Sequence, residues 1–240
     1  MMMLARALLA SAISSRLEPR GRATRVAMAV HGVGQDLRER FALYAAPAST
    51  ERRLADDEEP LPLHVMKPRG EVHRDGDWHR SIHLWLTDHA GGQLLLQRRS
   101  LYKDTHPGLL DVSCAGHVTE DDGVVETALR EAEEELGLRL TADELKAAWL
   151  GTLPSVASGE TATHGRFVCR EFQELFLVRC ADADALLDKL ALDADEVAGV
   201  EWRPSAAVIA AWAKHDSEFV HRPKHYRCAL GGALGLVGVV

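Results

Sequence analysis

The sequence contains no hydrophobic run long enough to cross a membrane. Residues 1–12 are apolar but interrupted by Arg6, and they fall short of the roughly 20 residues that a membrane-spanning helix needs. The apolar carboxyl-terminal segment, residues 228–240, is also shorter than that length. We therefore expect no membrane partner.

Basic charge is scarce as well. Lysine and arginine together number 28 against 36 aspartate and glutamate residues, which gives a formal net charge of -8. Binding to nucleic acid without sequence preference depends on a basic surface that neutralises phosphates. The charge balance therefore argues against a nucleic-acid partner.

Cysteine is sparse, and its positions are Cys114, Cys169, Cys180 and Cys228. Their spacing is not that of a zinc site, and the sequence has no His-Glu helix motif of a zinc peptidase. A chain of this size does not need a disulfide framework to fold. We therefore expect reduced thiols and a location inside the cell.

The length of 240 residues allows one catalytic domain with extensions. We expect an amino-terminal extension at residues 1–60, a catalytic domain at residues 61–227 and an apolar, glycine-rich tail at residues 228–240. Within the extension, the charged stretch from residue 35 to about residue 60 has the composition of a linker.

The first 30 residues differ from the rest in charge. They hold five arginines with alanine and serine between them, and Glu18 is their only acid. This composition resembles an organelle transit peptide, which would direct the protein to a mitochondrion or chloroplast. A disordered tail, or a start at Met28, is the alternative, and a cytoplasmic location is then expected.

The rest of the chain alternates between strand and helix patterns. Apolar and polar residues alternate over residues 81–86, which predicts a strand, and Gly91-Gly92 predicts a turn into a second one. The remaining expected elements are strands at residues 94–97, 172–178 and 200–202, an extended segment at 109–113, an amphipathic segment at 142–150, a helix at 206–214, and a loop at 154–165. The fold class is therefore mixed α/β.

One helix carries an unusual cluster of acids. Residues 124–136 are rich in alanine, leucine and glutamate, lack proline and internal glycine, and are followed by Gly137, a common helix stop. At about 100° of rotation per residue, Glu131, Glu134 and Glu135 fall within an arc of about 100° on one side of this helix. Their mutual repulsion amounts to a few tenths of a kcal/mol per pair.

A divalent cation would offset this repulsion. Ligands that are all carboxylate oxygens suit Mg²⁺ or Mn²⁺, and Mg²⁺ commonly shares its coordination shell with substrate phosphates. Arg130 is placed to orient Glu131 or to meet a phosphate. The alternative is a solvated acidic helix without a ligand, as most glutamate-rich helices are.

The segment around this helix resembles the Nudix box, G-x5-E-x7-R-E-U-x-E-E-x-G-U, where U is a bulky aliphatic residue. The matching positions are Gly116, Asp122, Arg130, Glu131, Ala132, Glu134, Glu135, Gly137 and Leu138. Asp122 stands where glutamate is usual, which shortens the reach of its carboxylate. Ala132 replaces the bulky aliphatic residue and would under-fill the core behind the helix.

The resemblance implies the Nudix α/β/α sandwich, with a mixed sheet between helices. It also implies a hydrolase that cleaves the diphosphate linkage of a small molecule, either a nucleoside diphosphate derivative or an isoprenoid diphosphate, with Mg²⁺ (or Mn²⁺) as cofactor. Its metal ligands would be Glu131, Glu134, Glu135 and the carbonyl oxygen of Gly116. Either Glu131 or Glu171, an acid outside the box, would accept the proton of the attacking water.

Basic residues ahead of the box are candidates for substrate binding. Arg98, Arg99 and Lys103 could hold substrate phosphate, or could simply form a basic surface strand. The tryptophans Trp78, Trp85 and Trp202 are expected to pack in the core.

A wider resemblance covers about residues 63–226. Residues 67–86 and 97–118, together with the box, are similar to the Nudix members nearest to isopentenyl-diphosphate isomerase and to plant-type Nudix hydrolases. Such isomerases have a cysteine where this chain has Ala115. Cys114 lies one residue earlier, and one residue along a strand reverses the side-chain direction. Hydrolysis is therefore favoured, with isomerisation or a catalytically silent diphosphate-binding module as alternatives.

The isomerase resemblance also suggests a second metal site. His73, His79 and His117 match the isomerase histidines, and Glu171 matches a metal-binding glutamate; Glu174 is the reserve acid. We expect His117 and Glu171 to be metal ligands. For His73 and His79 we favour polar positions on a surface loop.

Overall fold

The computed structural model describes residues 24–26, 37–161 and 165–236. The segment interpreted as a transit peptide lies outside the described residues, apart from residues 24–26. Residues 237–240 of the expected tail lie outside them too.

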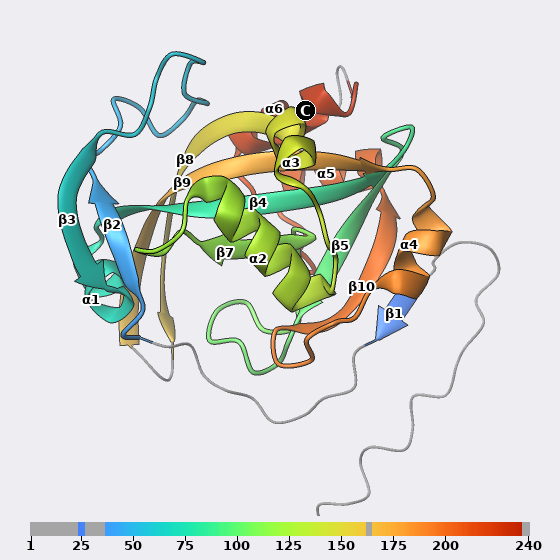
Figure 1. The fold of residues 1–240 in the computed structure, drawn as a ribbon, viewed down its shortest axis with the longest axis horizontal. Helices are drawn as coiled ribbons and strands as arrows, with labels where there is room; N and C mark the ends of the chain where they lie inside the picture. Colours follow the sequence, from blue (N-terminus) through green and yellow to red (C-terminus); the bar gives the residue numbers. More distant parts are fainter. Residues whose placement is uncertain (1–23, 27–36, 162–164, 237–240) are drawn as a thin grey trace, which may run out of the picture.

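A ten-stranded mixed sheet forms the frame (Figure 1). Its main path, from edge to edge, is β1 (Thr24–Val26), β10 (Val197–Pro204), β5 (Gln93–Arg99), β4 (Trp78–Asp88), β2 (Arg40–Tyr44) and β3 (Pro62–Pro68). Four strands join beside this path: β6 (Leu110–Asp111) on β5, β7 (Cys114–His117) and β9 (Gly165–Cys180) on β4, and β8 (Trp149–Thr161) on β9. The β4–β9 pair is parallel.

Helices cover both faces of the sheet. They are α1 (Arg69–Asp75), α2 (Val124–Leu136), α3 (Ala142–Ala148), α4 (Ala183–Lys189), α5 (Ser205–Ala213) and α6 (Lys224–Ala233). In Figure 1, α2 crosses the near face of the sheet and α5 lies behind it. The expected α/β/α sandwich with a mixed sheet is confirmed.

The alternation along β4 divides the core in two. Ile82, Leu84 and Leu86 belong to the hydrophobic cluster that contains α2, α3 and α4, while Trp85 belongs to the cluster that contains α5 and α6. A strand whose successive side chains point to opposite faces can serve both cores. In β4, Ser81 and His83 share the face of Trp85.

The acidic helix has the predicted bounds. α2 spans Val124–Leu136 and ends at Gly137, whose φ of 65° is left-handed and whose N–H bonds back to Ala132 and Glu133. Ala132 is fully buried in the core between α2 and the sheet. The glycine stop is therefore confirmed.

Two segments differ from the sequence prediction. The expected loop at residues 154–165 is wrong, because β8 and β9 pair along its length from Pro154↔Phe172 to Thr161↔Gly165. In the distal part of this hairpin the β8 residues 156–160 are solvent-exposed, so no apolar alternation marks them. The expected linker contains β2, where Phe41 and Leu43 are buried on a strand too short to stand out among charged neighbours.

Residues outside the expected catalytic domain contribute to the fold. β1 pairs with β10 and β2 pairs with β3, so the sheet includes strands that precede residue 61. At the other end, α6 continues into the expected tail, and Leu230 and Leu234 are buried there. Within the described residues, no helix is both long enough and apolar enough to span a membrane.

Alanine at Gly137 is expected to destabilise the fold more than alanine at Gly165, although φ is positive at both (65° and 72°). At Gly137 a Cβ would lie 2.7 Å from Cβ of Ala191, whereas at Gly165 it would meet no described atom within 4 Å. We expect Gly165→Ala to lower the free energy of unfolding by about 1–2 kcal/mol and Gly137→Ala by about 2–5 kcal/mol. Urea titration measures both, and equal losses would contradict the contact with Ala191.

Candidate functional site

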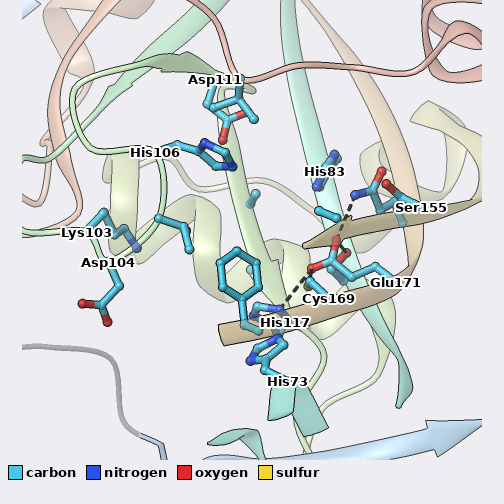
Figure 2. A pocket seen from close by; sticks show the side chains of 18 of the residues that line it. His73, His83, Lys103, Asp104, His106, Asp111, His117, Ser155, Cys169 and Glu171 are labelled. Atoms are coloured by element: carbon cyan, nitrogen blue, oxygen red, sulfur yellow. Dashed lines mark hydrogen bonds and ion pairs between the residues drawn. The ribbon is translucent and has the colours of Figure 1, made fainter. Parts of the chain in front are cut away.

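A pocket of about 1410 Å³ surrounds the end of β7 (Figure 2). The acids Glu131, Glu134 and Glu135 line it from α2, and His117 and Glu171 line it from β7 and β9. The structure therefore brings the box carboxylates and the acid outside the box into one cavity. Gly116 of β7 also lines it.

Gly116 allows α2 to approach the strand closely. A Cβ at this position would overlap the carboxylate of Glu131. Without a side chain here, that carboxylate rests directly against the β7 backbone. The glycine that opens the box is thus required by contact rather than by a left-handed backbone.

The carboxylates on α2 are crowded in a partly desolvated place. Burial, followed by repulsion from Glu135, raises the pKa of Glu131 to about 8, although Arg130 opposes this. Burial also raises the pKa of Glu135, against the attraction of Lys103 and Arg99. The ionised forms of these acids are therefore unfavourable unless a cation joins them.

Arg130 ties the acidic cluster to the box loop. Its Nε donates to Asp122 Oδ2 over 2.9 Å, and its Nη1 lies 3.0 Å from Glu131 Oε1 and 2.9 Å from Glu134 Oε2. The shorter Asp122 side chain therefore still reaches its partner. Glu134 remains solvent-exposed and faces the pocket.

The donor set of the box fits a hard divalent cation. Glu131, Glu134 and Glu135 supply only oxygens, and the backbone of Gly116 lies against Glu131. Mg²⁺ and Mn²⁺ prefer such ligands, and a cation would offset both the burial and the repulsion from Glu135 that raise the pKa of Glu131. The residues present thus fit the metal that the box implies.

A second cluster lies next to Glu171. The side chains of His73, His79, His117 and Cys169 bring one ligand atom each to within 4.8 Å of one another. His79 Nδ1 lies 3.0 Å from the carbonyl oxygen of Asp77, so Nδ1 donates and Nε2 keeps its lone pair. That Nε2 is 3.9 Å from Cys169 Sγ.

The expected surface-loop positions of His73 and His79 are wrong. His73 lies on α1 and His79 is fully buried on β4. Burial, together with charge repulsion from His79 and Arg69, lowers the pKa of His73 to about 3. A turn at Gly76, with φ of 71°, folds α1 back onto the sheet, and the histidine spacing alone does not reveal it.

Glu171 is held at the junction by its neighbours. Its Oε2 accepts from Ser81 Oγ at 3.1 Å and from Gln173 Nε2 at 2.8 Å, while Oε1 accepts from Cys169 Sγ at 3.0 Å and lies 3.2 Å from His117 Nε2. Burial favours the neutral acid, but the hydrogen bond and the charge interaction with His117 hold the pKa of Glu171 well below its usual value.

Two of the three basic residues expected to bind substrate phosphate lie at the pocket, and one does not. Arg99 and Lys103 line the pocket, Arg99 beside Asp111 and Lys103 in an ion pair with Glu196. Arg98 is not a pocket residue, which corrects its expected substrate contact. It bonds instead to Glu218 and to the carbonyl oxygen of Gly108, because consecutive side chains on β5 point to opposite faces.

Glu174 is excluded as the reserve acid. It is buried away from the pocket and accepts hydrogen bonds from Arg80, Trp149 and Thr152. The tryptophans expected in the core, Trp78, Trp85 and Trp202, are all buried.

The two residues before the box, Cys114 and Ala115, point to opposite sides of β7. Ala115 lines the pocket, whereas Cys114 is fully buried in the core beneath the sheet. Burial, followed by the charges of Glu135 and Glu131, raises the pKa of the Cys114 thiol well above its usual value. The reversal of side-chain direction between these two positions is confirmed, so no thiol takes the place of the isomerase cysteine.

The sequence did not reveal a polar wall of the pocket, which is formed by Asp111, Arg222 and His83. Asp111 is buried between the guanidinium groups of Arg222 and Arg99. His83 lies beside Tyr226, with 2.9 Å between Nδ1 and the phenolic oxygen. The alternation of residues 81–86 does place His83 on the face of Ser81, but nothing local reveals its partners from the carboxyl-terminal region.

Comparison with known proteins finds similarity to Nudix proteins, in a family model and in individual relatives. A family model described as NUDIX domain matches residues 77–223. Nudix hydrolase 3 of Arabidopsis thaliana is 38% identical over 156 residues, which cover 65% of this chain and 19% of that protein. An isopentenyl-diphosphate Delta-isomerase of Cutibacterium acnes is 30% identical over 159 residues, covering 61% of this chain and 75% of that protein.

Other relatives are matched over part of their length. An uncharacterized Nudix hydrolase of Clostridium acetobutylicum is 33% identical over 136 residues, covering 56% of this chain and 61% of that protein. The chain thus spans about a fifth of the plant relative and about three fifths of the clostridial one. A crystal structure of a Deinococcus radiodurans protein aligns with a TM-score of 0.48 at 20% identity, covering 80% of this chain and 97% of that one.

The raised pKa of Glu131 leads to a stability prediction. Its ionised form opposes folding when no cation is bound, and this penalty is absent below the ordinary pKa of 4.5 and grows as the pH rises toward about 8. We expect Glu131→Gln to raise the free energy of unfolding in EDTA at pH 8 by about 1–3 kcal/mol, with little effect near pH 4.5.

Urea titration at the two pH values measures this difference. The control is Glu133→Gln, which alters an exposed carboxylate paired with Arg139 and should have little effect at either pH. A loss of stability in the Glu131 variant at pH 8 would show that Arg130 outweighs the burial and crowding of Glu131.

Proposed function

This chain belongs to the Nudix hydrolase family, and we propose that it cleaves the diphosphate linkage of a small molecule with Mg²⁺ or Mn²⁺ as cofactor. The observation that carries the proposal is the convergence of Glu131, Glu134 and Glu135 with the Gly116 backbone on one pocket. Arg99 and Lys103 line the same pocket and can meet substrate phosphate.

The residues that would hold the cation are the three box glutamates and the Gly116 carbonyl oxygen. When bound, the cation neutralises the diphosphate oxygens and lowers the pKa of a water. Arg130 acts as a positioning residue, since it holds Glu131 and Glu134 through one guanidinium nitrogen. The products would be a monophosphate and a second phosphorylated or free group.

Glu131 is the better candidate for the proton acceptor. Both oxygens of Glu171 are engaged by surrounding donors, whereas the described partner of Glu131 is Arg130. A carboxylate saturated with hydrogen bonds is a weak base. Glu171 is then assigned to holding His117 and the cluster around it.

The cluster of His73, His79, His117 and Cys169 is proposed as a second cation site. Imidazole and thiolate ligands suit Zn²⁺ better than Mg²⁺. The carbonyl oxygen of Asp77 fixes the ring of His79, as such partners commonly do for metal-binding histidines.

Activity on a panel of diphosphates tests the main proposal. Nucleotide sugars, dinucleotides, oxidised nucleotides, isopentenyl diphosphate and dimethylallyl diphosphate are assayed for Mg²⁺-dependent release of phosphate or phosphomonoesters. We expect Glu134→Gln to lower kcat by about 100-fold or more because a metal ligand is lost. The matched control, Glu133→Gln on the same helix, should retain wild-type activity.

Two outcomes would replace the proposal. Conversion of isopentenyl to dimethylallyl diphosphate without phosphate release would identify an isomerase, despite Ala115 in the pocket. Diphosphate binding without any turnover would identify a silent binding module. Wild-type activity in Glu134→Gln would show that the metal ligands are assigned incorrectly.

Metal content tests the second cation site. After dialysis against Mg²⁺ buffer, we expect the purified protein to retain about one equivalent of zinc or another transition metal, measured by mass spectrometry. The double variant His79→Asn, Cys169→Ser should lose it, whereas Glu134→Gln should keep it. A metal-free wild-type protein with full activity would rule the second site out.

A further inference from the structure

Lys103 reaches the pocket from the loop that joins β5 to β6, and it is paired there with Glu196. Both residues line the pocket, and Lys103 is seen in Figure 2. The ammonium of Lys103 forms an ion pair with the carboxylate of Glu196, and only 14% and 33% of the two side chains are exposed, so solvent screens the pair only in part. A lysine has a long and flexible stem, so the place of its ammonium depends on such a partner.

Glu196 holds the same loop through its main chain. Its carbonyl oxygen accepts from the N–H of Ser100 over 2.9 Å, and the carbonyl oxygen of Ser100 accepts from the N–H of Lys103 over 3.2 Å. These main-chain bonds do not involve the carboxylate of Glu196. The side chain of Glu196 can therefore be changed without detaching the loop.

The segment that carries Glu196 is docked on the end of α2. The N–H of Ala191 donates to the carbonyl oxygen of Leu136 over 2.8 Å, and the N–H of Asp193 donates to that of Glu135 over 3.0 Å. Both bonds satisfy carbonyl groups that the last turn of a helix leaves without partners. The carboxylate of Glu196 is thus placed by the same helix that carries the box acids.

The charges around Lys103 show why this pairing matters. Burial lowers the pKa of Lys103, whereas the charges of Glu135 and Glu131 favour its ammonium form. Glu135 and Glu131 are also proposed cation ligands, and a divalent cation would cancel much of their attraction for Lys103. Glu196 is not one of those ligands, so its attraction remains.

We propose that Glu196 is a positioning residue, which holds the ammonium of Lys103 where it meets a phosphate group of the substrate. This inference rests on the proposed hydrolysis at the box. It gives a role to an acid outside the box that neither binds the cation nor accepts the proton of the attacking water.

This role predicts an effect whose sign depends on Lys103. A carboxylate repels phosphate groups, so Glu196 favours their binding only through the lysine that it holds. With Lys103 present, Glu196→Gln should weaken diphosphate binding. With Lys103→Met, the same change should leave binding unchanged or strengthen it. A carboxylate that merely tethered the loop would weaken binding in both backgrounds.

Calorimetric titration with methylenediphosphonate, a diphosphate analogue that cannot be hydrolysed, tests this at saturating Mg²⁺. We expect Lys103→Met to raise Kd by about tenfold or more and Glu196→Gln to raise it by about three- to tenfold. The double variant should bind no more weakly than Lys103→Met alone. On any substrate that the panel identifies, Glu196→Gln should raise KM more than it lowers kcat.

Two control variants separate pairing from charge. Asp193→Asn removes the same charge from a neighbouring pocket carboxylate, which accepts from the N–H of Asp195 over 3.0 Å. Its Kd should stay within about twofold of the wild type. Glu196→Asp keeps the charge and should retain most of the affinity, because the flexible stem of Lys103 can follow the shorter acid.

A separate titration with Mn²⁺, followed by electron paramagnetic resonance without diphosphate, tests whether Glu196 binds the cation itself. We expect Glu196→Gln to weaken Mn²⁺ binding far less than Glu134→Gln does. Equal losses of Mn²⁺ affinity in these two variants would make Glu196 a cation ligand and overturn the inference.

Three further results bear on the inference. Equal weakening of diphosphate binding by Glu196→Gln with and without Lys103 would overturn it, and so would a wild-type protein that does not bind methylenediphosphonate. The proposed function fails separately. If no diphosphate is hydrolysed while the dependence on Lys103 holds, the pocket is a diphosphate-binding module in which Glu196 still positions Lys103.

Discussion

The site depends on the contact between the carboxylate of Glu131 and the bare backbone of Gly116. That contact lets α2 lie close enough to β7 for Glu135 to be buried and for both acids to face the pocket. The fold accepts this unfavourable charge density because apolar residues on the core-facing side of α2, such as Ala132 and Leu136, are fully buried. Hydrophobic burial thus stabilises a helix whose polar side is arranged for a cation.

β7 organises the site because its residues alternate between two environments. Cys114 is buried in the core on the side of α2, and Gly116 lies against Glu131 of α2 at the edge of the cavity, while Ala115 and His117 line the cavity from the other side of the strand. The box acids and the histidine cluster are therefore separated by a single strand. The cavity around the end of β7 is therefore lined by groups from both faces of the sheet.

The local features of the fold could be predicted from the sequence, whereas long-range contacts could not. The helix at residues 124–136, its glycine stop and the strand pattern near residue 82 depend on nearby residues. His79 and Cys169 are 90 positions apart and meet only through the parallel pairing of β4 and β9. Arg222 and Asp111 likewise meet only once the segment before α6, which pairs with β6 at Phe219, has been brought against that strand.

The hairpin of β8 and β9 gives the pocket a wall that is more exposed to solvent than the side formed by α2 and β7. Val156, Ala157 and Ser158 line the cavity from the exposed part of β8, with little core behind them. Substitutions there can reshape the cavity with small effects on stability, because surface changes seldom disturb packing. By contrast, Glu135 and Gly116 are fixed by the contacts that build the fold. The architecture therefore separates a part of the cavity wall that tolerates substitution from the residues whose contacts hold α2 against β7.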